Sequence, residues 1–139
     1  MKNRVFATLS SLTLLTAAAA FAQSNAVMQA DIPFAFHIGA KILPPGHYEV
    51  RPHGVQDVLS IECLLCNASA LIVMNRADAG KTTGLATLVF NRYGKTRFLS
   101  RVWIPEYSQE KALSKSKAEL EFARDSSPVS HVEVALVRR

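Results

Sequence analysis

The sequence predicts a mainly β domain, a small antiparallel β-sandwich or barrel of about seven short strands with one helix in its C-terminal half. Short runs rich in β-branched and aromatic residues recur along the chain, separated by turns that contain Gly or Pro. One late segment, residues 112–124, has neither Gly nor Pro and is rich in Ala, Leu, Lys and Glu. Strands do not alternate with helices, so a βαβ fold is not expected.

Residues 1–22 are expected to be a secretory signal peptide. Lys2 and Arg4 precede an uncharged run over residues 5–20, and Ala20-Phe21-Ala22 places small residues where signal peptidase reads them. The alternative is an N-terminal membrane anchor, but the run is shorter than the roughly 20 apolar residues of a membrane span. We therefore expect an exported protein, periplasmic or extracellular, with no transmembrane segment after cleavage and a single β-rich domain over residues 23–139.

The charge of the mature chain argues against nucleic acid as a partner. Without Lys2 and Arg4, 14 of the 16 basic residues remain against 11 acidic ones, so the net charge is only +3. Four of the remaining cations gather near one turn, where solvation accounts for them more simply than an anionic partner. They are Arg92, Lys95, Arg97 and Arg101.

The segment 27–51 opens the domain with an alternating strand. Its apolar face carries Ile32, Phe34, Phe36 and Ile38, and Pro33 marks an edge strand or a bulge. Turns are expected at 39–41 and 43–46, where Gly and Pro set the backbone angles. Further short strands are expected at 47–50, 57–62 and 68–75, and a polar loop at 78–84. In the strand 68–75, Leu71 and Val73 point to the face opposite that of Ile72 and Met74.

The segment 84–105 is expected to form a β-hairpin around which the other strands are arranged. Its arms are 85–90 and 98–104, and Gly94 supplies the positive φ of a tight turn, with either Tyr93-Gly94 or Gly94-Lys95 as the central pair. Strict alternation gives the arms two faces. The first face carries Leu85, Thr87, Val89, Phe98, Ser100, Val102 and Ile104, and the second carries Ala86, Leu88, Phe90, Leu99, Trp103, Arg97 and Arg101.

A helix and a last strand are expected after the hairpin. The helix can begin within 108–111 and continue over 112–124, where Leu113, Leu120 and Ala123 form a thin apolar stripe. Pro128 separates it from a strand at 129–137, whose apolar face carries alternate residues. These are Val132, Val134 and Leu136.

Four motifs resemble a family of small exported proteins of acidobacteria. They are Ile32-Pro33-Phe34-x-Phe36-x-x-Gly39, Leu43-Pro44-x-Gly46-x-Tyr48-x-Val50, Phe90-x-Arg92-Tyr93-Gly94 and Phe98-Leu99-Ser100-x-Val102-Trp103. The resemblance covers nearly the whole mature chain and implies a small secreted β-domain. It carries over no functional residue, because the family has no assigned activity, and the paired cysteines are not a feature of it.

The two cysteines, Cys63 and Cys66, are expected to form a disulfide. An exported protein meets an oxidising compartment, but residues three apart in a strand lie roughly 10 Å apart, so the bond requires a turn across Leu64-Leu65. A thioredoxin-like role is not favoured, because no helix is expected to begin there and lower a thiol pKa. Haem attachment needs a His after the second cysteine, where Asn67 stands.

No catalytic residue, cofactor or metal site is expected. The four histidines, His37, His47, His53 and His131, have no paired ligand spacing, although His47 and His53 could converge with the cysteines. Gly80-Lys81-Thr82 lacks the earlier glycine of a phosphate-binding loop.

Three functions remain for a chain of this kind. The first is a non-catalytic envelope protein that binds another protein or a cell-wall polymer. The second is a small-ligand carrier with a pocket lined by aromatic residues, namely Tyr48, Phe90, Tyr93 and Trp103. An enzyme is ranked last. For either of the first two, the candidate ligand or interaction face is formed by Tyr93, Arg97, Arg101 and Trp103.

Overall fold

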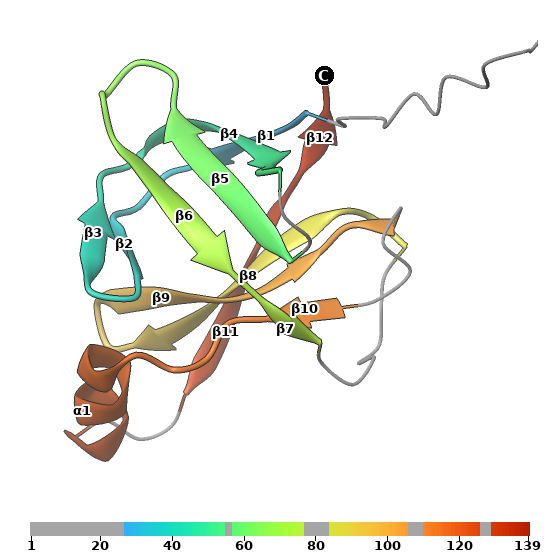
Figure 1. The fold of residues 1–139 in the computed structure, drawn as a ribbon. Helices are drawn as coiled ribbons and strands as arrows, with labels where there is room; N and C mark the ends of the chain where they lie inside the picture. The colour runs from blue at the N-terminus through green and yellow to red at the C-terminus, as the bar shows by residue number, and fades with distance from the viewer. Residues whose placement is uncertain (1–26, 55–56, 77–83, 106–109, 126–128) are drawn as a thin grey trace, which may run out of the picture.

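The computed structural model describes residues 27–54, 57–76, 84–105, 110–125 and 129–139 and contains two facing β-sheets with one helix (Figure 1). The expected signal peptide, most of the expected loop at 78–84 and residues 108–109 of the expected helix lie outside the described residues. In chain order the elements are β1 (Met28–Ile32), β2 (Phe36–Ile38), β3 (Lys41–Leu43), β4 (Gly46–Pro52), β5 (Val58–Cys63), β6 (Ser69–Val73), β7 (Asn75–Arg76), β8 (Thr87–Tyr93), β9 (Thr96–Trp103), β10 (Glu110–Ala112), α1 (Lys117–Asp125), β11 (Ser130–Ala135) and β12 (Val137–Arg138).

The fold is a small β-sandwich, as expected, and it is not closed into a barrel. One sheet has the strand order β12-β1-β4-β5-β6, and the other has the order β11-β8-β9-β10-β7. The hairpin β2–β3 extends the second sheet, where β2 pairs in parallel with β9 through His37 and Phe98. Every other pairing between the described strands is antiparallel.

More strands are present than the expected number of about seven, because several continuous apolar runs change sheet part of the way along. The first run breaks after Ile32, so that β1 joins one sheet and β2 the other. The last run breaks at Leu136, which separates β11 on β8 from β12 on β1. The run expected at 68–75 likewise divides at Met74 into β6 and β7. Such corners let a single strand contribute to both layers of a sandwich.

The β8–β9 hairpin is confirmed, and the expected faces of its second arm hold for Arg97, Phe98 and Leu99 but are wrong beyond Ser100. Tyr93 pairs with Thr96, so the central pair is Gly94-Lys95, and Gly94 has a φ of 61°. The register shifts at Val89 and Phe90, so that Ser100 is the extra residue of a bulge. The extra residue reverses the alternation in the far half of β9. Val102 and Ile104, not Trp103, therefore face the core, which also contains Leu88, Phe90 and Leu99.

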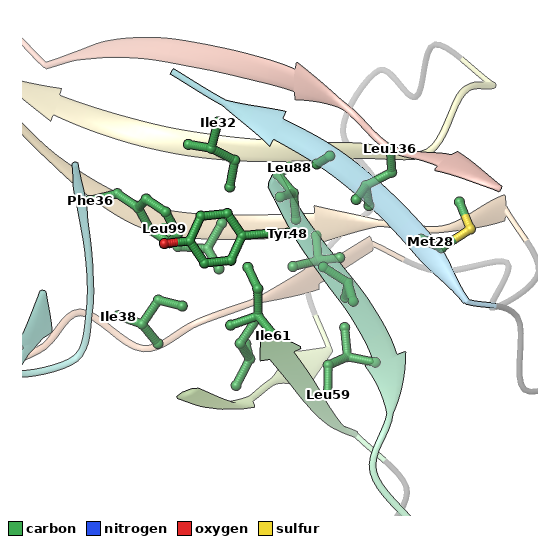
Figure 2. Close-up of a cluster of buried hydrophobic side chains, with 14 of the residues drawn as sticks. Met28, Ile32, Phe36, Ile38, Tyr48, Leu59, Ile61, Leu88, Leu99 and Leu136 are labelled. Carbon is green, nitrogen blue, oxygen red and sulfur yellow. The ribbon is translucent and has the colours of Figure 1, made fainter. Parts of the chain in front are cut away.

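The core fills the space between the two sheets (Figure 2). Its centre is aromatic: the ring of Phe36 packs edge to face against Tyr48 and Phe90, with centroids 5.3 Å apart in both pairs. Burial of these side chains supplies the main stabilisation of the fold. The labelled members in Figure 2 are Met28, Ile32, Phe36, Ile38, Tyr48, Leu59, Ile61, Leu88, Leu99 and Leu136.

The expected helix is shorter than predicted, because its first part forms a strand. Residues 110–112 form β10, which pairs with both β9 and β7. The helix begins only after Ser116, whose Oγ accepts a hydrogen bond from the backbone N–H of Glu119 at 3.2 Å. This is the geometry of an N-cap. Leu120, expected to face the protein, is half exposed, and the helix buries Glu119 instead.

Candidate functional site

The structure does not gather the expected face of Tyr93, Arg97, Arg101 and Trp103 onto one surface. Tyr93 lies next to the hairpin turn, whereas Trp103 lies at the far end of β9 and is partly buried. Arg97 lies on the face of the hairpin opposite to that of Tyr93. Its guanidinium lies over the ring of Phe34, 4.4 Å from the centroid. Arg101 is exposed. These four side chains therefore do not form a single contact face.

Tyr93 belongs to a buried polar cluster beneath the helix. Its hydroxyl donates a hydrogen bond to Glu119 at 3.1 Å, and Asn91 Nδ2 donates to the same carboxylate oxygen at 2.8 Å. Burial, and next the charge of Glu119, raise the pKa of the Tyr93 hydroxyl. The cluster fastens α1 to β8, and its only signal in the sequence is the Glu that stands three residues after Ser116.

The expected disulfide between Cys63 and Cys66 is present, with Cα atoms 5.5 Å apart. As anticipated, the bond spans the turn that joins β5 to β6. Its sulfur atoms lie against Gly46, where an added Cβ would lie 3.0 Å from Cys63 Sγ, a contact tight enough that the sulfur would have to move by a few tenths of an ångström. Cys66 Sγ also lies 4.0 Å from the hydroxyl of Tyr48, and burial raises the pKa of this tyrosine.

Four large apolar side chains of the β5–β6 hairpin are exposed. Leu64 and Leu65, between the cysteines, are 46% and 92% exposed, and Leu71 and Val73 on β6 are 54% and 67% exposed. The hairpin extends along the outer side of the sandwich, with its turn at the upper left of the view (Figure 1). The sequence placed Leu71 and Val73 opposite the core residues Ile72 and Met74, a signal that could have identified this surface.

Strand β6 is an edge of its sheet, and the register shows which of its backbone groups point outward. The N–H of Cys63 donates to the carbonyl of Ala68 at 2.7 Å, so this pair and every second pair after it are hydrogen-bonded. The intervening residues, Ser69, Leu71 and Val73, direct their N–H and C=O groups away from β5. Within the described residues no strand pairs with β6 on that side.

A second surface feature lies at the ends of β1 and β4. His47 Nδ1 contacts Asp31 Oδ1, and a shallow, open hollow of about 440 Å³ lies beside them. Its walls also include Ile32, Pro33 and Pro45. His47, which could converge with the cysteines, contacts the disulfide turn through its backbone. The carbonyl of His47 accepts a hydrogen bond from the N–H of Leu64 at 2.9 Å.

Neither a metal cluster nor a membrane span is found in the described part of the chain. No three His, Cys, Asp or Glu side chains there are close enough together to hold a metal ion. Likewise, no helix within the described ranges has the length and apolar character needed to cross a bilayer.

Comparison with known proteins gives no relative: no family model, no curated protein and no solved structure matches this chain.

Proposed function

We propose that this chain is an exported, non-catalytic interaction module that binds another protein through its β5–β6 hairpin. The observation that carries the proposal is the exposure of Leu64, Leu65, Leu71 and Val73 on one hairpin. Single exposed apolar residues are ordinary on protein surfaces, whereas several on one element are typical of a contact surface. The disulfide supports this role, because it restricts the turn on which Leu64 and Leu65 are exposed.

A protein partner is favoured over a cell-wall polymer by the chemistry of the hairpin. Leu and Val side chains bury apolar area against other apolar side chains, whereas sugar rings stack on exposed aromatic faces and bind polar groups. None of the four exposed large apolar residues of the hairpin is aromatic. The signal-like residues 1–22 support placement of the module in the cell envelope.

The alternative of a small-ligand carrier has one supporting observation, the hollow beside His47 and Asp31. A pocket lined by the aromatic residues has less support, because Tyr48 and Phe90 are fully buried. Both rings pack against Phe36 in the core. A ligand in the hollow would instead meet prolines and the imidazole edge.

The experiment is crosslinking of the native cell envelope followed by capture of this protein and mass spectrometry. The proposal expects a protein that is recovered with the wild type and lost with the double change Leu64→Ser and Leu65→Ser. The matched control is Leu85→Ser, which removes an exposed leucine from another part of the chain. Equal recovery from all three forms, or recovery of a wall fragment alone, would contradict the proposal.

A further inference from the structure

The edge strand β6 lacks most of the features that keep sheet edges from pairing. Natural edge strands are protected by charged residues, proline, bulges or a covering segment. The five residues of β6 include no charge and no proline, and their register with β5 is continuous over five pairs. Among the described residues, one charged side chain contacts the edge. It is Lys41, whose Nζ donates a hydrogen bond to the outward carbonyl of Ser69.

Lys41 protects only one end of the edge. The outward N–H and C=O groups of Leu71 and Val73 lie beyond Ser69, beside side chains that are exposed. Two residues with outward backbone groups can exchange up to four hydrogen bonds with an added strand. Main-chain bonds of this kind give affinity in strand addition, and the alternating side chains give specificity.

The charges near the edge indicate the composition of the added strand. Lys41 stands at the Ser69 end, and the exposed Arg76 follows the other end. Glu62, the acidic residue paired with Ser69, lies one strand further in. A complementary segment is therefore apolar in its centre, opposite Leu71 and Val73, and acidic at both ends.

A second copy of this chain fits the edge less well. Antiparallel pairing of two β6 strands would bring the Lys41 end of one copy to the Arg76 end of the other, and like charges placed together are destabilising.

We propose that β6 is a strand-addition site, which binds an extended segment of a partner protein that has alternating apolar residues in its centre and acidic residues at both ends. The inference rests on the proposed interaction function and specifies its mode of binding. The added segment extends the five-stranded sheet next to Leu71 and Val73, and its acidic ends meet Lys41 and Arg76.

The test uses the full chain and a labelled synthetic peptide with Val at alternate central positions, Thr between them and Glu at both ends, followed by fluorescence anisotropy. Leu71→Pro removes an outward N–H without removing a hydrogen bond to β5, because that N–H points away from β5. Leu71→Thr is the matched control, since it keeps the N–H and loses the apolar side chain. We expect Leu71→Pro to weaken binding about fivefold to tenfold more than Leu71→Thr does.

Two peptide variants make the same test without changing the protein. Methylation of alternate peptide amides in the set that faces β6 is expected to abolish binding, whereas methylation of the other set leaves β6 pairing intact. Replacing the Glu ends by Lys is expected to weaken binding about tenfold at low salt and less at high salt. Circular dichroism and the unfolding midpoint test whether Leu71→Pro is folded. If Leu71→Pro does not fold, Val73→Pro is used in its place.

Several outcomes would overturn the inference. These are no binding of the Glu-ended peptide at millimolar concentration, equal losses for Leu71→Pro and Leu71→Thr, or equal binding of the Lys-ended peptide. A dimer of the peptide-free chain in light scattering that Leu71→Pro disrupts would assign the edge to a second copy. If these tests fail while the Leu64 and Leu65 changes still release a captured protein, the interaction function stands and only strand addition is excluded.

Discussion

Asn91 on β8 donates a hydrogen bond of 2.8 Å to Glu119, and this pair joins α1 to the outer face of the second sheet. Glu119 is 3% exposed and is the one buried side chain of the helix. The apolar contacts of α1 are partial, because Leu120 and Phe122 remain substantially exposed. The helix is therefore attached by this buried polar contact together with the ring of Phe122, which lies 5.6 Å from that of Phe98.

Loss of the Glu119 carboxylate is expected to destabilise the domain. Glu119→Ala leaves the buried donors of Asn91 and Tyr93 without an acceptor, and we expect a loss of about 2–3 kcal/mol in the free energy of unfolding. Glu119→Gln keeps an acceptor oxygen and should cost less. Denaturant unfolding measures both, with Glu121→Ala on the exposed side of the helix as control. Equal effects of the two alanine changes would refute the anchoring role.

The contact between Lys111 Nζ and Asp57 Oδ1 joins β10 to the turn before β5. Lys111 is buried, so removing its partner leaves a charge with little solvent access. We expect Asp57→Asn to lower stability by about 2–3 kcal/mol. Asn is chosen over Ala because residue 57 has a φ of 67°, which Asn tolerates.

A second change separates the charge effect from the loss of the side chain. Adding Lys111→Met to Asp57→Asn removes the uncompensated charge and keeps an apolar side chain of similar length, so most of the lost stability should return. Thermal unfolding of the single and double variants gives the comparison. Additive losses in the double variant would show that the two residues are not energetically coupled.

Loss of the disulfide is expected to have a modest effect on stability. The loop that it closes is short, with a sequence separation of three, so changing both Cys63 and Cys66 to Ser should cost about 2 kcal/mol. The variant should keep the far-ultraviolet circular dichroism spectrum of a β-protein. A chain that fails to fold without the bond would show that the disulfide does more than fix the turn.

Acid is expected to destabilise the domain in part through His37. Burial lowers the pKa of His37 from 6.5, and its ring packs 4.5 Å from that of Phe98. The unfolded chain therefore binds the proton more readily, so this contribution to stability is present above about pH 6.5 and is lost as the pH falls below it. His37→Phe should flatten the profile of unfolding midpoint against pH in that range. His131→Gln at an exposed position should leave the profile unchanged, and a wild-type slope in His37→Phe would contradict the assignment.

The sequence predicts local features well where one residue type decides them. Gly94 at the hairpin turn, the division of Leu71 and Val73 from Ile72, and the turn across Leu64-Leu65 are all found in the structure. Each follows from a short-range rule on backbone angles, alternation or disulfide geometry. The signal peptide and the resemblance to acidobacterial exported proteins stay predictions.

Features that depend on a distant partner were not predictable in the same way. The bulge at Ser100 has no local mark, because it is defined by the register of β9 against β8. Residues 110–112 have ordinary helix propensity and become β10 because two strands flank them. Glu119 reads as a solvent-exposed helix residue until Asn91 and Tyr93 are known to lie beneath it.

The pairing of β1 with β12 has a consequence for the order of folding. Met28 is opposite Arg138, a residue 110 positions later in the chain. Strand β11, which completes the second sheet, also follows α1 in the sequence. Contacts this distant in sequence close large loops and slow the folding reaction. A ribosome or a translocation channel that releases the chain from its N-terminus therefore delivers β1 long before its outer neighbour, and we expect the sandwich to assemble in one late, cooperative step.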